Sequence, residues 1–173
     1  EVDESDKHPD WTYDTAVRTV TVTAGVTRAV IYTNTHYGYA EVRKSTNTGA
    51  NLGGWKFNLY TDEARTKLVT GSPFTTPDTG IIDIELTPGD YWVQEVDESN
   101  TKPYWEFDTT VRKLTVKAGQ TANVTFTNTH YGYAKLVKET NTGADRAGRK
   151  INIYTDEGCT DLLDGSPFVT GED

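Results

Sequence analysis

The chain repeats its own sequence with a period of 94 residues. Aligning residues 1–79 with residues 95–173 gives 45 identical pairs out of 79, without a gap. The run EVDES at residue 1 returns at residue 95, and the run NTHYGYA at residue 34 returns at residue 128. Self-similarity at one fixed offset is the signature of a duplicated structural unit. We therefore interpret the chain as a tandem duplication.

The chain is out of phase with this repeat. If a unit begins at Tyr37, residues 37–130 form one complete repeat. Residues 1–36 are then the C-terminal part of a preceding repeat, and residues 131–173 are the N-terminal part of a following one. Two explanations stay open: the chain is a window on a longer array, or the two partial repeats complete each other between chains.

Composition limits the partners that the chain can have. Its 17 basic and 26 acidic residues give a formal net charge of −9 without a basic stripe, so we expect no nucleic-acid binding. The longest apolar runs span only a few residues, so we expect no membrane insertion and no signal peptide. The lone Cys159 cannot form an internal disulfide, and no CxxC or HExxH spacing occurs. We expect no metal and no other cofactor.

Apolar residues in the complete repeat alternate with a period of two, which is typical of β-strands. Turn-forming runs such as Pro88-Gly89-Asp90 separate the alternating segments. The pattern predicts an all-β sandwich, with an excursion at residues 61–70 that could hold a short helical turn. The expected strands are residues 39–44, 55–60, 81–86, 91–96, 111–117 and 122–128.

Three of these strands end an inward-facing apolar row with a polar residue. The strand pleat places Lys44, Glu95 and Asn128 at these ends, each preceded by apolar residues at every second position. Burying an amine, a carboxyl and a carboxamide without partners would cost several kcal/mol each. A hydrogen-bonded buried ion pair is one explanation, and a chemical reaction among the three groups is the other.

The three groups are suited to forming a Lys–Asn isopeptide bond. Loss of water would lower the pKa of Lys44, which makes its amine a neutral nucleophile. It would also raise the pKa of Glu95, so that a protonated carboxyl could polarise the Asn128 carboxamide and transfer protons while ammonia leaves. Because the product is neutral, most of the cost of burial would disappear.

The complete repeat also carries a recognisable set of sequence runs. They are GYAEVRK from residue 38, TG at residue 48, WKFNLY from residue 55, LTPGDYWVQE from residue 86 and VTFTNT from residue 124. In these runs the repeat resembles the collagen-adhesin B-type domain, the SpaA-like repeat of Gram-positive surface proteins and pilins. The resemblance implies an inverse immunoglobulin-like, or prealbumin-like, β-sandwich. It also implies a reactive lysine on the first strand, a catalytic glutamate and an asparagine on the last strand, roles that fall on Lys44, Glu95 and Asn128.

The partial repeats each carry only part of this set. The leading one has Glu1 in the catalytic position and Asn34 in the asparagine position, and the trailing one has Lys138 in the lysine position. We expect a sandwich of this kind to hold the two parts at opposite poles. Lys138 of one chain could then form a crosslink with Asn34 of the next, with Glu1 as catalyst. Such a head-to-tail contact does not close, so it would propagate as a filament.

A structural role outside the cell follows from these expectations. We predict the shaft of a bacterial cell-surface adhesin or pilus-like fibre, with other repeats of the same protein as partners and self-modification as the only catalysis. The resemblance alone implies attachment to a Gram-positive cell wall, because no LPxTG-type sorting signal or anchor tail occurs in the sequence. The rival hypothesis is a binding module in which Trp11, Tyr104 and Trp105 contact carbohydrate or a matrix protein.

Overall fold

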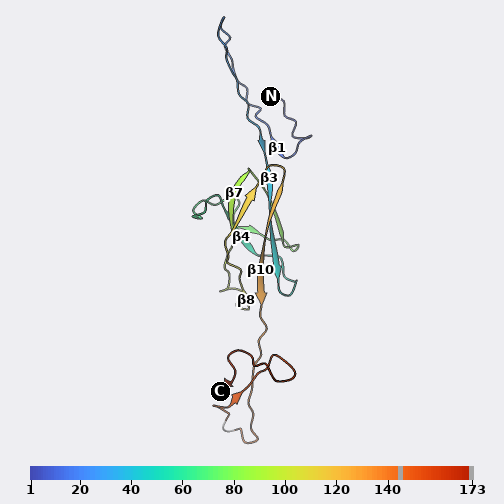
Figure 1. Ribbon diagram of the computed structural model, residues 1–173, viewed down its shortest axis with the longest axis vertical. Coiled ribbons are helices and arrows are strands. Elements are labelled where there is room, and N and C mark those ends of the chain that lie inside the picture. The colour runs from blue at the N-terminus through green and yellow to red at the C-terminus, as the bar shows by residue number, and fades with distance from the viewer. Residues whose placement is uncertain (144–145, 172–173) are drawn as a thin grey trace. The chain divides into compact units, whose positions relative to one another are not determined.

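The computed structural model describes residues 1–143 and 146–171. The chain divides into two compact units, Glu1–Tyr131 and Gly132–Asp173. The first unit contains the complete repeat and most of the regular structure (Figure 1). Within the described residues there is no helix, and so none that could cross a bilayer.

Two four-stranded sheets pack into a sandwich in the first unit (Figure 1). One sheet has the strand order β6-β3-β10-β8 and the other has the order β5-β4-β7-β9. All six strands expected from the alternation are present, with ends shifted by at most two residues. The excursion at residues 61–70 contains turns, bends and an isolated bridge from Leu68 to Tyr60, and no helical turn. The strands are β3 (Gly38–Thr46), β4 (Lys56–Tyr60), β5 (Phe74–Thr75), β6 (Ile81–Leu86), β7 (Gly89–Glu95), β8 (Trp105–Glu106), β9 (Arg112–Val116) and β10 (Thr121–His130).

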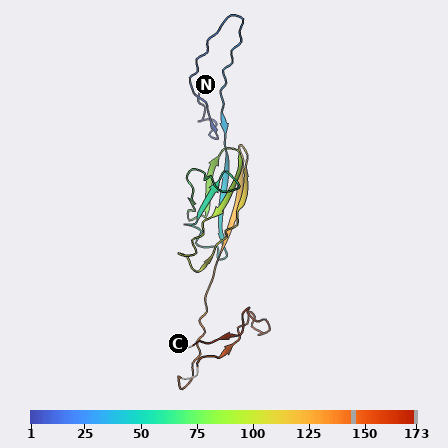
Figure 2. The same cartoon turned by 90° about the vertical axis from the view of Figure 1, so that its left-hand side faces the viewer.

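The first long strand of the sandwich lies beside the last. β10 pairs with β3 in parallel, from Thr121 opposite Tyr39 to Asn128 opposite Thr46. On its other side β3 pairs with β6 in the antiparallel sense. Figure 2 shows β3 and β10 running together along one side of the sandwich. This arrangement places residues from the two ends of the repeat on neighbouring strands.

Alternating side chains from both sheets fill the space between them. Phe57 of β4 and Phe126 of β10 are fully buried, with ring centroids 5.0 Å apart. Burying a side chain of this size contributes about 1.5–3 kcal/mol to stability. The buried hydrophobic residues of this core are Ala40, Val42, Trp55, Phe57, Leu59, Ile82, Ile84, Leu86, Tyr91, Val93, Leu114, Val116 and Phe126.

The partial repeats do not form the long strands that their counterparts form in the complete repeat. Residues 13–34 correspond to a region with β9 and most of β10, yet they contain only an isolated bridge between Thr23 and Val26. Residues 132–143, which correspond to β3 and the turn after it, contain no strand. The reason is pairing: residues 121–128 of β10 take their backbone partners from β3, and residues 1–36 contain no counterpart of β3. A strand without neighbours is not stable alone.

Short strands form where both partners of a pair are present. In the first unit β1 (Trp11–Thr12) pairs with β2 (Thr35–His36). In the second unit β11 (Lys150–Ile151) pairs with β12 (Phe168–Val169). The sandwich itself is seen once in the described part of the chain. Repetition of the whole fold therefore stays a prediction from the sequence.

Candidate functional site

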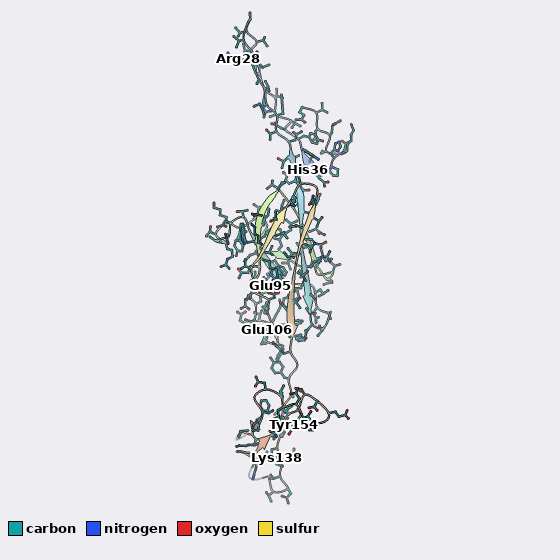
Figure 3. The ribbon with its side chains drawn as sticks, viewed as in Figure 1. Arg28, His36, Glu95, Glu106, Lys138 and Tyr154 are labelled. Atoms are coloured by element: carbon teal, nitrogen blue, oxygen red, sulfur yellow. The ribbon has the colours of Figure 1, made fainter. Side chains whose placement is uncertain are left out.

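Lys44, Glu95 and Asn128 meet inside the sandwich. Lys44 on β3 and Asn128 on β10 come from neighbouring strands of one sheet, and Glu95 ends β7 in the facing sheet. The exposed fractions of the three residues are 5%, 2% and 0%, respectively. Figure 3 labels Glu95 within the body of the sandwich. The strand pleat, read from sequence, thus placed all three side chains on the correct faces.

The Glu95 carboxyl lies between the other two groups. Lys44 Nζ is 3.1 Å from each carboxyl oxygen. Asn128 Nδ2 donates a hydrogen bond to Glu95 Oε1 at 2.8 Å. A carboxyl in contact with both an amine and a carboxamide can take a proton from one and pass it to the other. The arrangement therefore places the Glu95 carboxyl where it can exchange protons with both neighbours.

Burial changes the protonation preference of this pair. Desolvation lowers the pKa of Lys44, although the nearby Glu95 charge and hydrogen bond oppose that change. Desolvation raises the pKa of Glu95, although Lys44 and the Asn128 hydrogen bond oppose it. Both directions lower the cost of moving the proton from the amine to the carboxyl, compared with the same pair in water.

Two neighbours fix the position of Lys44. The Trp55 ring centroid lies 4.7 Å from Lys44 Nζ, so an apolar surface covers the amine. The Lys44 backbone N–H donates to the Gly80 carbonyl at 2.7 Å. Gly80 has a φ of +74°, and a Cβ there would come within 2.9 Å of Leu52. Only glycine accommodates both this backbone conformation and this close approach without strain.

The loop between β8 and β9 holds the other side of Asn128. The backbone N–H of Asp108 donates to Asn128 Oδ1 at 2.8 Å. The two terminal nitrogens of Arg112 donate hydrogen bonds of 3.1 and 2.8 Å to the Asp108 carboxylate. Burial opposes the ionisation of Asp108, but the Arg112 hydrogen bonds and other donors outweigh it and lower the pKa. Sequence analysis missed Asp108 and Arg112, although the Asp-x-x-x-Arg spacing is retained in the first copy as Asp14 and Arg18.

The leading partial repeat contains part of the same site. Asn34 Nδ2 donates to Glu1 Oε1 at 2.6 Å, and the Asp14 backbone N–H donates to Asn34 Oδ1 at 3.0 Å. Glu1 is exposed and Asn34 is half-buried, unlike their counterparts in the sandwich. We call Glu1, Asn34 and Asp14 the half-site. Lys138 lies in the second unit, where it is exposed (Figure 3).

The tryptophans considered for ligand binding take part in packing. His130 stacks on Trp105 with ring centroids 4.2 Å apart and planes 4° apart. His36 stacks on Trp11 in the same way, at 4.3 Å and 12°. One face of each indole is therefore covered by a neighbour from its own strand pair.

Metal and thiol chemistry find no support in the described residues. They contain no group of three or more His, Cys, Asp or Glu side chains arranged to hold a metal ion. Cys159 is an exposed free thiol in the second unit.

The fold and the site together define a class of protein: an all-β domain whose first and last strands pair in parallel around a buried amine, carboxyl and carboxamide. The family model described as the SpaA prealbumin-like fold domain matches residues 38–130. This match covers more than half of the chain, and the chain belongs to this family. The resemblance seen in the sequence and the prealbumin-like sandwich that it implied are confirmed.

Several solved structures are similar to the chain. They include GBS52, the minor pilin of Streptococcus agalactiae, with 19% identity over 61% of this chain and a TM-score of 0.48. The Bacillus anthracis TIE protein has 23% identity over 59% of this chain and a TM-score of 0.43. The major pilin subunit BcpA of Bacillus cereus has 20% identity over 53% of this chain and a TM-score of 0.44. The matches span 49%, 20% and 28% of those three chains, respectively. No curated protein matches the sequence.

Proposed function

We propose that the complete repeat is a structural shaft domain that forms its own isopeptide bond between Lys44 and Asn128, with Glu95 as the catalytic acid and base. The observation that carries this proposal is the buried Glu95 carboxyl in contact with both reacting groups. Membership of the SpaA family supports it, because the resemblance implies this chemistry in adhesins and pilins. Lys44, Glu95 and Asn128 are all buried, so their side chains contact one another more readily than a separate substrate in solution.

The reaction balances with these three side chains alone. Lys44 passes a proton to Glu95, and the neutral Nζ attacks Cγ of Asn128 to form a C–N bond. Glu95 returns that proton to Nδ2 and takes the surplus proton from Nζ. The bond between Cγ and Nδ2 then breaks, ammonia leaves, and Glu95 ends protonated beside a neutral amide. The buried charges are lost, which favours the product.

The bond would serve a shaft because it joins the first strand to the last. It closes a loop of roughly 84 residues, and a closure of that length restricts the unfolded chain by about 4–5 kcal/mol on the disulfide analogy. The only cysteine in the sequence is Cys159, so a disulfide within the chain cannot do the same. We place such a shaft outside the cell, in a surface adhesin or pilus-like fibre attached to a Gram-positive cell wall.

Intact-mass measurement tests the crosslink directly. The wild-type chain is expected to weigh one ammonia less than its sequence, and a peptide map should join the segments containing Lys44 and Asn128. Glu95→Gln should restore the full mass because the proton carrier is lost. Glu1→Gln is the matched control in the half-site and should leave the mass deficit in place. A wild-type chain of full mass would remove the crosslink from the proposal.

The half-site is proposed to take its lysine from a strand with the sequence around Lys138. Moving the β10 positions back by 94 residues and the β3 positions forward by 94 residues places Tyr32 opposite Lys138 and Asn34 opposite Thr140. A second copy of the chain carries this strand, so head-to-tail joining would follow. If the chain is a window on a longer array, the array itself supplies the corresponding lysine.

Denaturing electrophoresis separates these two sources. Head-to-tail joining predicts concentration-dependent oligomers that survive boiling in detergent. Lys138→Ala and Asn34→Ala should each abolish them. Lys135→Ala is the control, because residue 135 has the opposite parity on the same segment and should face away from the site. Purely monomeric bands at high concentration would leave only the longer-array explanation.

A further inference from the structure

We infer that the Asp108 backbone N–H is the oxyanion donor of the bond-forming reaction and that Arg112 is the residue that positions it. This inference rests on the proposed function of the same site. The N–H donates to Asn128 Oδ1 at 2.8 Å, and this oxygen gains negative charge when the amine adds to Cγ. A fixed donor aimed at such an oxygen stabilises the transition state more than the ground state.

Arg112 ties the donor to the strand that carries the acceptor. Asp108 lies in the irregular segment between β8 and β9, so no sheet ladder fixes its backbone. Its carboxylate accepts two hydrogen bonds from Arg112 and one each from the backbone N–H groups of Thr127 at 3.2 Å and Thr110 at 3.3 Å. The Arg112 guanidinium also lies 4.2 Å from the ring centroid of Phe126. Asp108 is thus held against residues 126 and 127, immediately before Asn128.

The same arrangement, an aspartate carboxylate bound by the arginine four residues later, occurs a second time around Asn34. We call it the Asp-x-x-x-Arg clamp. Arg18 binds the Asp14 carboxylate at 2.6 Å, and the Thr33 backbone N–H donates to that carboxylate at 3.2 Å. The Arg18 guanidinium lies 4.5 Å from the Tyr32 ring centroid. The long strands of the sandwich are absent around this copy, so their packing cannot be what creates the clamp. It is a local arrangement that accompanies the asparagine.

A test must separate positioning from charge. The Asp108 carboxylate and the Arg112 guanidinium both act on the buried pair: Arg112 lowers the pKa of Lys44, and Asp108 raises it. Removing either charge would therefore change the pH dependence as well as the geometry. Arg112→Lys keeps the positive charge but loses the two-pronged grip on the carboxylate.

The experiment follows bond formation in the full chain. Chain recovered uncrosslinked in denaturant is refolded by dilution, and the loss of ammonia is timed by intact mass across a pH series. Arg112→Lys is expected to lower the maximum rate by about 10-fold or more, since small misplacements of reacting groups are costly. The pH values at half-maximal rate should not move. Arg18→Lys is the matched control and should leave the rate unchanged.

Two further measurements make the outcome decisive. Tryptophan fluorescence during refolding should show that Arg112→Lys folds as fast as the wild type. In the Glu95→Gln background, which cannot react, Arg112→Lys should unfold at the same denaturant concentration as its parent. Crosslinking at the wild-type rate, or slow crosslinking that merely follows slow folding, would overturn the inference while leaving the proposed function intact. A wild-type chain that never loses ammonia would remove both.

Discussion

The surroundings of Asn128 and Asn34 share a local sequence but differ in what covers them. In both places the asparagine amide reaches a glutamate, and an Asp-x-x-x-Arg clamp supplies a backbone donor to its oxygen. Asn128 is fully buried, whereas Asn34 is half-buried and Glu1 is exposed. The local network therefore forms from nearby residues alone, and long-range strand pairing adds the lysine and excludes water.

The site therefore has two parts, which come from different halves of the repeat sequence. The asparagine, its clamp and the glutamate all lie in the second half of a repeat. Lys44 lies in the first half and reaches the others only because β3 pairs in parallel with β10. The three side chains of a site split in this way meet only after the sandwich has folded, and the burial that lowers the pKa of Lys44 arises at the same stage.

The largest expected effect contrasts the two lysines. Lys44→Ala should lower the free energy of unfolding by at least about 4–5 kcal/mol, because it removes the loop closure. Lys138→Ala, at the exposed counterpart, should change it by less than about 0.5 kcal/mol. Chemical denaturation followed by tryptophan fluorescence measures both. Equal effects would show that the complete site adds no covalent stability.

The pH dependence of crosslinking should sharpen the contrast. Bond formation needs one proton shared by Lys44 and Glu95, so the rate should be bell-shaped with a plateau between two limits. Below the acid limit both groups are protonated, so the amine cannot attack. Above the alkaline limit neither group holds the proton that ammonia needs to leave. Both limits belong to the coupled pair, in which burial lowers the pKa of Lys44 and raises that of Glu95.

Timed intact-mass measurement during refolding gives this profile. Each limb should fall by about tenfold per pH unit, since a single proton is gained or lost. A rate that rises steadily to high pH would show that free Lys44 alone limits the reaction and that Glu95 supplies no proton.

The smallest effect concerns the contact that joins the leading segment to the complete repeat. The Tyr39 hydroxyl donates to Asp10, and this hydrogen bond raises the pKa of Tyr39 to about 12. Because the folded pKa lies above the ordinary value of 10.0, the contact stabilises the junction below pH 10 and is lost as the pH rises through about 12. Ultraviolet titration of tyrosinate should show one tyrosine shifted back toward 10 in Asp10→Asn. Asp6→Asn, in the same segment, is the control and should leave the titration unchanged.

Sequence alternation predicted the long strands of the complete repeat because it directly records which side of a strand faces the core. It placed Lys44, Glu95 and Asn128 inward for the same reason. Alternation does not say which strands are neighbours, so it could not predict that β3 lies beside β10 and brings Lys44 and Asn128 to adjacent strands. The two-residue strands β5 and β8 are too short to show a period.

The partial repeats show where pattern and structure diverge. Residues 28–34 share three of seven residues with their counterparts in β10, yet they form no strand because residues 1–36 contain no counterpart of β3. Strand formation depends on packing and pairing more than on the segment itself. The Asp108 clamp was missed for the opposite reason. It is a local hydrogen-bond motif in a loop, and hydrophobic periodicity gives no information about loops. The only sequence signal for it is the Asp-x-x-x-Arg spacing.

The parallel pairing of β3 and β10 sets how the domain responds when stretched. The chain enters β3 at Gly38 and leaves β10 at His130, and both strands point the same way. Pulling the two ends apart therefore slides one strand lengthwise against the other. In this shear geometry the paired residues from Thr121–Tyr39 to Asn128–Thr46 bear the load at the same time. In an antiparallel hairpin pulled open from one end, the pairs would instead break one after another.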